Sequence, residues 1–477
     1  MANRSSRGGG TEPHDLRLTA ADVAGTTGGS LVSGDPASSI GGFSIDSRLL
    51  VAGDMFFAIA GPRFDGHDFV GAALGRGAAG AVVSRIPGPP PVHGVVIVVD
   101  DTVRALQVLA RSIRRRSGAA VVAVTGSAGK TTTKEAAAAM LGARYTVFRN
   151  QGNLNNHIGL PLSLLDLRHR PEIAVVELGM NHAGEIRTLV GIAEPDVRVW
   201  TNVAEVHTEF FASLDAVADA KAEILEGATP TTLLVANADD PLVMARARAF
   251  AGRVMTFGFD PAADVSARDL EERALDGLAA LLRTPAGEAP IRIPLLGRAN
   301  VANVLAAACV AVHFEVPLSV VVERAAALKP AAHRGEVLRL AGGVTLVDDS
   351  YNSNPRALRG VLEVIAREDR VARRIAVLGE MLELGRQSRT LHEISGRAAA
   401  AANLRYLITV GGEAARALGE SAAAAGMSSD DVFHVGTSEE AADTVMTLVR
   451  AGDLVLVKGS RGIRTDVVVD RLKAEFA

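Results

Sequence analysis

The sequence contains a single cysteine and few aromatic residues. Cys309 lies in the apolar run 304–310, so no disulfide can form within the chain, and we interpret this residue as a small buried side chain. No uncharged apolar run is long enough to span a bilayer, and residues 1–15 are polar and glycine-rich, without the apolar segment of a secretory signal. We therefore expect a disordered tail over residues 1–15 and a soluble, cytoplasmic protein without a membrane span.

An excess of charge of either sign is also absent. The chain has 50 Lys and Arg residues against 54 Asp and Glu residues, which gives a formal net charge of -4. This balance gives no electrostatic reason to bind nucleic acid, and the three arginines at 114–116 are explained by a solvated helix end. We expect no nucleic-acid partner and a monomeric protein.

The length, by contrast, exceeds that of one ordinary core. At about 150 residues per domain, 477 residues suggest three domains. The stretch 116–118 marks the first boundary, and a proline at 330 marks the second. The predicted domains therefore cover residues 16–118, 119–328 and 329–477.

Short apolar strands alternate with helical patterns in each predicted domain. This alternation is typical of parallel sheets built from strand–helix–strand units, so the predicted fold class is α/β, with a Rossmann-like third domain. The strands are expected at residues 79–83, 95–99, 120–124, 173–178, 197–201, 232–235, 344–347, 375–378, 406–410 and 454–457. Functional groups should lie at the carboxyl ends of these strands.

The most informative segment follows the strand at 120–124. It reads Thr125-Gly126-Ser127-Ala128-Gly129-Lys130-Thr131-Thr132-Thr133 and leads into a helix-forming run. Its glycines let backbone N–H groups point at an anion, and the helix N-terminus adds the positive end of its dipole. Lys130 can reach the β- and γ-phosphates of a nucleotide, and the Thr131 hydroxyl can hold a magnesium ion. An ordinary glycine-rich turn is the alternative. The order of strand, turn, lysine, hydroxyls and helix favours a protein that hydrolyses or transfers a phosphate of ATP.

Two further side chains follow strands of the same predicted sheet. Glu177 lies at the end of the strand at 173–178, and His207 comes shortly after the strand at 197–201. A carboxylate in this position is well placed to ligate magnesium, and the histidine is expected beside the phosphate site. A surface or capping glutamate and a structural histidine are the alternatives.

Lys221 is notable for its place in a helix expected over residues 214–225. The apolar stripe of that helix comprises Leu214, Val217, Ala218, Ile224 and Leu225, and Lys221 falls on this stripe. A buried lysine is easily deprotonated, and a neutral amine can react with carbon dioxide to give an anionic carbamate that binds magnesium. The alternative is a structural lysine whose stem is buried while its head reaches solvent.

Asn300 and Asn303 open an alanine-rich helix after Gly297. An asparagine presents both a donor and an acceptor to the edge of an adenine. It is also a common helix cap, and the spacing alone leaves both interpretations open.

Together these segments resemble the Mur ligases, a family of ATP-dependent, amide-forming enzymes of peptidoglycan synthesis. The resemblance extends from about Ile40 over nearly the whole chain. It rests on residues 125–133, 153–161, 177–181, His207, 220–221, 297–303, 333–335 and 349–355.

Three segments indicate a branch of that family. Residues 155–159, 351–355 and 379–385 are most similar to the branch that joins D-alanyl-D-alanine to UDP-N-acetylmuramoyl-tripeptide (UDP-MurNAc-tripeptide). Alternatives of the same architecture are the diaminopimelate- or lysine-adding branch and the folylpolyglutamate synthetases, which lack the N-terminal domain. A P-loop NTPase that acts as a binding switch is an alternative of a different class.

The resemblance implies a role for each domain and for named residues. The first domain would bind the uridine end of UDP-MurNAc-tripeptide through Ser47 and Arg48, the second would bind ATP, and the third would bring in D-alanyl-D-alanine. The implied catalytic residues are Lys130, Glu177, His207 and Lys221. The implied ligands of two magnesium ions are Thr131, Glu177, His207 and a carbamylated Lys221. The implied nucleotide contacts are Thr125, Gly126, Ser127, Ala128, Gly129, Lys130, Thr131, Thr132, Asn300, Asn303, Arg334 and Asp349. The remaining substrate contacts are Asn155, Asn156, Tyr351 and Asn354.

Overall fold

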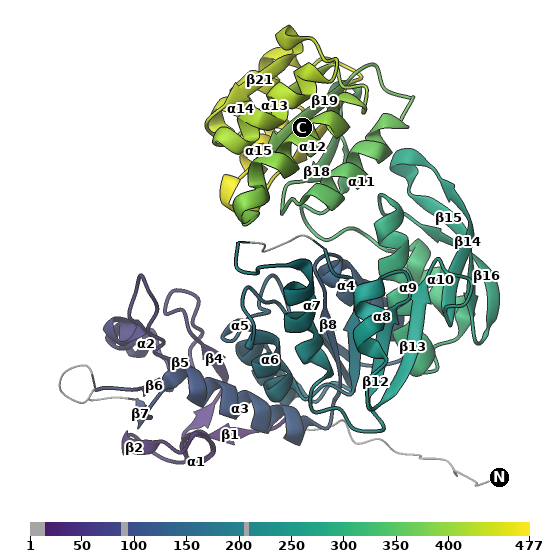
Figure 1. Cartoon of the computed structure of the whole chain (residues 1–477). Helices are drawn as coiled ribbons and strands as arrows, with labels where there is room; N and C mark the ends of the chain where they lie inside the picture. Colours follow the sequence, from purple (N-terminus) through teal and green to yellow (C-terminus); the bar gives the residue numbers. More distant parts are fainter. Residues whose placement is uncertain (1–14, 87–93, 205–208) are drawn as a thin grey trace. The chain divides into compact units, whose positions relative to one another are not determined.

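The computed structural model of the chain describes residues 15–86, 94–204 and 209–477, and its helices and strands are labelled in Figure 1. His207, a predicted site residue, lies outside the described residues. The described part alternates helices with strands, and its strands form three larger sheets and one two-stranded pair. The predicted α/β fold class is therefore confirmed.

The mutual contacts of the residues define two compact units. One holds the residues up to Ala123 with Tyr145–Met180 and Gly184–Val197, and the other holds Val124–Arg144, Asn181–Ala183 and Arg198–Ala477. The domain boundaries at 118 and 328 were placed from sequence composition, and they stay predictions.

A five-stranded sheet in the order β2-β7-β6-β5-β4 forms the N-terminal part of the first unit. Its strands are β2 (Ser30–Ser33), β4 (Gly42–Ser44), β5 (Asp54–Phe57), β6 (Gly80–Val83) and β7 (Val95–Val98), beside the separate pair β1 (Leu18–Thr19) and β3 (Ser39–Ile40). Every neighbouring pair of the five-stranded sheet is parallel except β2 with β7. The helices of this part are α1 (Ala20–Thr27), α2 (Val70–Gly75) and α3 (Thr102–Ser117).

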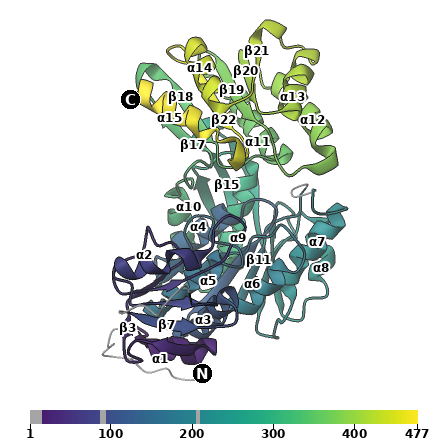
Figure 2. The same ribbon diagram turned by 90° about the vertical axis from the view of Figure 1, so that its left-hand side faces the viewer.

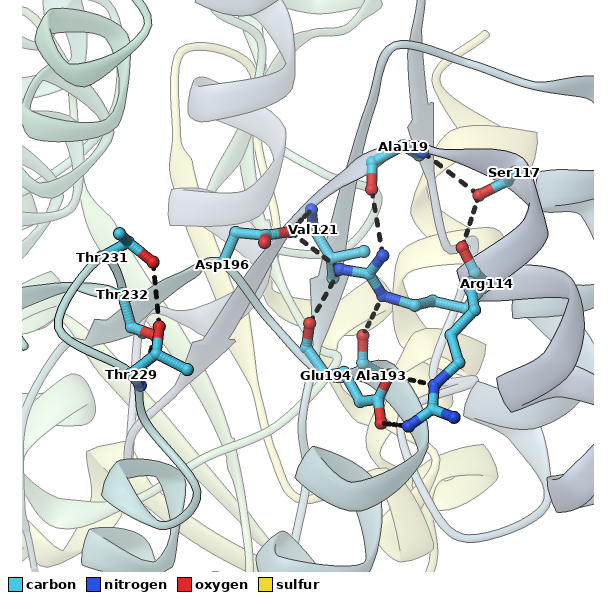
Figure 3. A network of polar contacts seen from close by, with 11 residues as sticks. Arg114, Ser117, Ala119, Val121, Ala193, Glu194, Asp196, Thr229, Thr231 and Thr232 are labelled. Atoms are coloured by element: carbon cyan, nitrogen blue, oxygen red, sulfur yellow. Dashed lines mark hydrogen bonds and ion pairs between the residues drawn. The ribbon is translucent and has the colours of Figure 1, made fainter.

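Arg114 fixes the end of α3 within the first unit. Its guanidinium donates to the backbone carbonyls of Ala193 and Glu194 and to the Asp196 carboxylate, each at 2.8 Å (Figure 3). The same Asp196 oxygen accepts the backbone N–H of Val121, at 2.8 Å. One half-buried arginine thereby connects the end of α3 to the turn after α6 and to the strand that begins at Ala120.

That strand, β8, is an inner strand of a nine-stranded sheet in the order β16-β15-β14-β13-β12-β11-β8-β10-β9. The strands are β8 (Ala120–Thr125), β9 (Val147–Arg149), β10 (Ile173–Glu177), β11 (Val197–Trp200), β12 (Leu233–Asn237), β13 (Arg253–Gly258), β14 (Val265–Glu272), β15 (Leu278–Thr284) and β16 (Gly287–Ile293). The four strands predicted in this segment are present with ends shifted by at most two residues. The antiparallel extension β14-β15-β16 was not predicted; charged residues interrupt β14 and β16, and only β15 has a continuous apolar run.

Helices connect these strands and cover the sheet. They are α4 (Lys130–Leu141), α5 (Gly159–Leu164), α6 (Glu185–Ala193), α7 (Leu214–Ala222), α8 (Pro241–Ala247), α9 (Arg298–His313) and α10 (Leu318–Ala326). The helix predicted over 214–225 is shorter, since α7 ends at Ala222 and one 3-10 turn follows. The guanidinium of Arg198 accounts for this tight turn, because it binds the carbonyls of Ile224 and Glu226.

A six-stranded sheet in the order β17-β18-β22-β19-β20-β21 forms the C-terminal part of the second unit. Its strands are β17 (Glu336–Arg339), β18 (Thr345–Asp349), β19 (Arg374–Gly379), β20 (Tyr406–Val410), β21 (Val432–Val435) and β22 (Leu454–Lys458). All neighbouring pairs are parallel except β17 with β18. The carboxyl ends of β18, β22 and β19 therefore lie at one edge, next to each other.

Helices cover both faces of this sheet (Figure 2). They are α11 (Pro355–Ala366), α12 (Ser388–Ala400), α13 (Glu413–Ala424), α14 (Ser438–Leu448) and α15 (Asp466–Glu475). Side chains of α11, α12 and α13 share one apolar core, whereas those of α14 and α15 share a second core on the opposite face. Throughout the described ranges, every helix is too short or too polar to cross a bilayer.

Candidate active site

The predicted phosphate loop leaves β8 and enters α4 through two glycines with left-handed backbone angles. Gly126 has φ +149° and Gly129 has φ +83°. A Cβ atom at Gly126 would lie 1.9 Å from Thr201 Oγ1, and a Cβ atom at Gly129 would lie 2.0 Å from Asn303 Oδ1. Both positions therefore require glycine for conformation and for space. Gly129 is also the N-cap residue of α4 and has no side-chain oxygen to cap it, which suits a helix end that binds phosphate.

Thr201 and Asn202, which follow β11, hold this loop in place. The Asn202 side chain accepts the N–H of Ala128 at 2.9 Å and donates to its carbonyl at 3.1 Å, and its backbone carbonyl accepts the N–H of Ser127. Thr201 Oγ1 donates to the Ala128 carbonyl at 2.7 Å. The sequence patterns gave no role to Asn202 or to Thr201. The loop shape depends on contacts between residues more than 70 positions apart, which no local motif contains.

Lys130 and Lys221 are brought together. The Lys130 ammonium donates to the carbonyl of Gly126, at 2.9 Å. Lys221 is only 2% exposed, as its place on the apolar stripe predicts. Burial, followed by the positive charge of Lys130, holds the pKa of Lys221 well below the ordinary range of a lysine. The Lys221 amine is therefore easily deprotonated, which is the condition for carbamate formation.

Two arginines fix the helix that carries Lys221. Arg246 binds Asp215 and Asp219 on the exposed face of α7, with its closest oxygen at 2.7 Å. Arg198, which is 2% exposed, holds the turn after α7. Lys221 is thus positioned by its own helix and by charged groups on both sides of it.

Asn303 is hydrogen-bonded to Asn300 and lies against the phosphate loop. The Asn303 side chain donates to Asn300 Oδ1 at 3.0 Å, and Asn300 donates to the carbonyl of Leu296 at 2.8 Å. Asn303 lies against Gly129, as the contact of an added Cβ shows. In this arrangement Asn303 shapes the phosphate loop. The predicted contact of both residues with adenine stays a prediction.

Glu177 lies in the first unit, with Asn155 as its neighbour. The amide of Asn155 donates to the Glu177 carboxylate at 2.9 Å, and the Glu177 N–H donates to Asn150 Oδ1 at 3.1 Å. Glu177 and Asn150 are both almost fully buried. Asn156 does not share the contact of Asn155 with Glu177. Its side-chain oxygen accepts the N–H of Gly159, at 2.7 Å, at the start of α5. In the structure, Asn155 therefore contacts the predicted metal ligand Glu177, whereas Asn156 contacts the backbone at the start of α5.

The predicted uridine contacts lie in the turn after β4. Arg48 forms a two-pronged pair with Asp46, with distances of 2.9 and 2.7 Å. The hydrogen bonds from Arg48 lower the pKa of Asp46 to about 2. Ser47 is half-buried in the same turn. Arg48 is otherwise exposed, so its guanidinium can still present donors to a ligand.

The predicted third-domain contacts gather at the carboxyl ends of β18 and β22. The Lys458 ammonium binds the Asp349 carboxylate at 2.6 Å and the carbonyl of Asn352 at 2.9 Å. Burial raises the pKa of Asp349, and Lys458 opposes that effect. The Arg334 guanidinium lies over the ring of Tyr351, 4.1 Å from its centroid. Asn354 caps α11 by accepting the N–H of Ala357 at 2.9 Å. Lys458, the last residue of β22, was not predicted as a site residue, although functional groups were expected at the carboxyl ends of the strands.

The residues present fit a nucleotide phosphate and a hard cation. The two clashing Cβ positions show a loop whose backbone leaves no room for side chains, as a phosphate cradle requires. Among the residues that the structure describes, no group of three or more His, Cys, Asp or Glu side chains gathers as a metal site would. The predicted magnesium ligands would not form such a group, because they include Thr131 and Lys221 beside Glu177. The fourth, His207, lies outside the described residues.

The chain is similar to known proteins over most of its length. Three family models match it: "Mur ligase family, catalytic domain" over residues 39–114, "Mur ligase middle domain" over 124–311, and "Mur ligase, glutamate ligase domain" over 333–461. The UDP-N-acetylmuramoyl-tripeptide–D-alanyl-D-alanine ligase of Bacillus subtilis is 32% identical, over 91% of this chain and 93% of its own length.

Solved structures agree with this similarity. A crystal structure of MurF from Acinetobacter baumannii has a TM-score of 0.86 and 30% identity, and the match covers 96% of this chain and 99% of that one. The crystal structure of MurF ligase from Thermotoga maritima in complex with ADP has a TM-score of 0.78 and 29% identity, and the match covers 91% of this chain and 97% of that one.

Proposed function

The chain belongs to the Mur ligase family, and from this premise we infer that it is the ATP-dependent ligase that joins D-alanyl-D-alanine to UDP-MurNAc-tripeptide. The observation that supports this function most strongly is the phosphate loop around Lys130 together with the buried Lys221, whose pKa the charge of Lys130 helps to lower. A phosphate cradle alone would suit many NTPases. A buried lysine with a lowered pKa beside the cradle suits an enzyme that converts this amine to a carbamate and places a metal ion next to the transferred phosphoryl group.

The reaction consumes one ATP for each amide bond. A carboxylate oxygen of the tripeptide attacks the γ-phosphorus and ADP leaves, which gives an acyl phosphate. The amine of D-alanyl-D-alanine then attacks the acyl carbon, and the tetrahedral intermediate expels phosphate. The products are UDP-MurNAc-pentapeptide, ADP and phosphate. Water must be excluded meanwhile, because it would hydrolyse the acyl phosphate.

Each part of the chain has a proposed share in this reaction. Lys130 and the loop 125–132 bind the β- and γ-phosphates, and the ammonium of Lys130 stabilises the charge on the transferred phosphoryl group. Asn300 and Asn303 are proposed on the adenine side. Arg334 and Asp349 are proposed to reach the nucleotide from the third domain, and Ser47 with Arg48 to bind the uridine end. Asn155, Asn156, Tyr351 and Asn354 are proposed around the peptide substrates.

Magnesium fits this set of residues. Thr131, Glu177, His207 and a carbamylated Lys221 would hold two ions, which supply positive charge to the phosphate oxygens when bound. Asn155 would keep the Glu177 carboxylate oriented. The depressed pKa of Lys221 supports a carbamate, since only the neutral amine reacts with carbon dioxide.

The remaining proposals concern the whole chain. We propose domains over residues 16–118, 119–328 and 329–477 that bind the uridine nucleotide, ATP and the dipeptide in turn, in a cytoplasmic monomer. The diaminopimelate- or lysine-adding ligases share the architecture, and a P-loop switch shares the cradle. Neither alternative accounts for the similarity to a D-alanyl-D-alanine ligase over nine-tenths of both chains.

Phosphate release tests the function. The purified protein is incubated with ATP and magnesium, with UDP-MurNAc-tripeptide, D-alanyl-D-alanine, both, or neither. We expect rapid release only with both substrates, together with a pentapeptide product in the mass spectrum. Release that is independent of both would indicate a switch. Release in a parallel incubation with UDP-MurNAc-dipeptide and diaminopimelate or lysine, but not with the tripeptide and D-alanyl-D-alanine, would indicate the other ligase branch.

A further inference from the structure

Two arginines from different loops share one aromatic ring in the C-terminal part of the chain. Arg334 precedes β17, and Arg461 follows β22. Their guanidinium carbons lie 4.1 Å and 5.7 Å from the centroid of the Tyr351 ring, so the two charges are less than 10 Å apart. Tyr351 thus holds two cationic groups near the carboxyl ends of β18 and β22.

Hydrogen bonds and an ion pair hold the loops that carry Arg334, Tyr351 and Arg461. The Tyr351 N–H donates to the carbonyl of His333 at 3.0 Å, which connects the ring to the segment of Arg334. Lys458, 2% exposed, ties the end of β22 to the loop after β18 through Asp349 and Asn352. Ser460 Oγ accepts the N–H of Leu382 at 2.9 Å, so the residue before Arg461 is held as well. The two guanidinium groups therefore project from a rigid base.

Lys458 and Arg461 lie at the same edge of the sheet but differ in their capacity to bind a ligand. Lys458 is buried in its pair with Asp349 and cannot receive a ligand without breaking that pair. Arg461 is 65% exposed, and the nearest oxygen of Asp466 lies 3.8 Å from it, beyond the length of a hydrogen bond. The Arg461 guanidinium therefore retains its capacity to bind an incoming anion in a two-pronged manner.

We propose that Arg461 binds the free carboxylate of D-alanyl-D-alanine and that the dipeptide lies along Tyr351 between Arg461 and Arg334. This inference rests on the proposed function, in which Arg334 reaches the phosphoryl group. The dipeptide must place its amine at the acyl phosphate, which leaves its carboxylate at the far end. A dipeptide spans about 7 Å at about 3.5 Å per residue, which lies within the upper limit of about 10 Å that the two centroid distances set on the separation of the guanidinium carbons.

Binding of the acceptor carboxylate by Arg461 would favour a dipeptide over a single amino acid. A single D-alanine is about half as long, so it cannot reach Arg461 with its carboxylate while its amine meets the acyl phosphate. Arg461 is thus a specificity-determining residue that measures the length of the acceptor.

The test compares Arg461→Gln with the wild type on two acceptors, D-alanyl-D-alanine and its C-terminal amide, which lacks the carboxylate. Arg464→Gln, which removes a guanidinium from the same turn, is the matched control. We expect Arg461→Gln to raise KM for D-alanyl-D-alanine about 10- to 100-fold, the effect of losing a charge-assisted pair. KM for ATP should not change. On the amide, wild type and Arg461→Gln should have the same KM, and Arg464→Gln should match the wild type on both acceptors.

Two results would overturn the inference. One is an unchanged KM of Arg461→Gln for D-alanyl-D-alanine. The other is an increase of the same size on the amide, because the effect would then not involve the carboxylate. A wild-type protein that joins neither acceptor to UDP-MurNAc-tripeptide would instead refute the proposed function, and this result is read from the wild type alone.

Discussion

The side chain of Asn303 lies against Gly129 so closely that a Cβ atom there would come within 2.0 Å of its Oδ1. Gly129 also has φ +83°, which costs about 1–2 kcal/mol for a residue with a Cβ. We predict that Gly129→Ala lowers the melting temperature and abolishes binding of ADP, measured by calorimetry. Gly184→Ala is the matched control, since Gly184 caps α6 at φ +90° and has no atoms within 4 Å of an added Cβ. Equal effects of the two substitutions would contradict a tight phosphate loop.

Asn155 should act through Glu177, to which its amide donates at 2.9 Å. We predict that Asn155→Ala raises the magnesium concentration needed for half-maximal rate several-fold, because the carboxylate loses its orienting partner. Asn156→Ala removes the acceptor of the Gly159 N–H at the start of α5 instead and should cost about 1 kcal/mol of stability, with an unchanged magnesium requirement. A magnesium titration and thermal unfolding of both variants separate these roles. An unchanged requirement in Asn155→Ala would exclude the assigned connection.

Lys130→Ala should remove product formation and leave the fold intact. The Lys130 ammonium donates to the carbonyl of Gly126, and its proposed role is to stabilise the charge on the transferred phosphoryl group. The loss should be at least about a thousand-fold in rate, on the scale of a removed transition-state donor. Rate measurement with a parallel melting curve checks both parts. Retention of a tenth of the wild-type rate would contradict the role given to Lys130.

Lys221 should carry a carbamate, because burial and Lys130 keep its pKa low. With ¹³C-labelled bicarbonate, we predict a carbamate resonance in the wild type that is missing from Lys221→Ala. That variant should be nearly inactive, and short carboxylates should restore part of its activity. Strict bicarbonate depletion should slow the wild type. A structural lysine predicts that Lys221→Met keeps near-normal turnover and that carboxylates restore nothing.

Acid should destabilise the first unit through Glu194. Hydrogen bonds from Arg115 and then Arg111 lower the pKa of Glu194 to about 2, from an ordinary value of 4.5. A depressed carboxylate pKa stabilises the fold above the unfolded value and loses that contribution as pH falls from about 4.5 towards 2. Glu194→Gln should therefore melt earlier at neutral pH and show a flatter decline below about pH 4.5. Glu413→Gln, at a largely exposed site, is the control and should melt like the wild type throughout.

Local sequence patterns predicted those features that lie within a short stretch of chain. The phosphate loop is contiguous, so its glycines, lysine and threonines were identified directly. Lys221 was identified because its helix repeats every 3.6 residues, and its burial agrees with that pattern. The strands that precede the functional loops were identified from their apolar runs.

Contacts between distant segments could not be predicted in this way. Thr201 and Asn202 hold Ala128 across neighbouring strands, and Arg461 meets Tyr351 across 110 positions of sequence. The end of the helix α7 at Ala222 depends on Arg198, which lies in the strand β11. Such contacts follow from the order of strands in the sheets, which the residues of one segment do not contain.

The most direct test of the account follows one oxygen atom. UDP-MurNAc-tripeptide labelled with ¹⁸O in its terminal carboxylate is converted with ATP and D-alanyl-D-alanine, and the released phosphate is analysed by mass spectrometry. Because the carboxylate oxygen attacks the γ-phosphorus, we predict one ¹⁸O atom in each phosphate and one phosphate for each pentapeptide. Unlabelled phosphate, or phosphate formed without pentapeptide, would contradict ligation through an acyl phosphate.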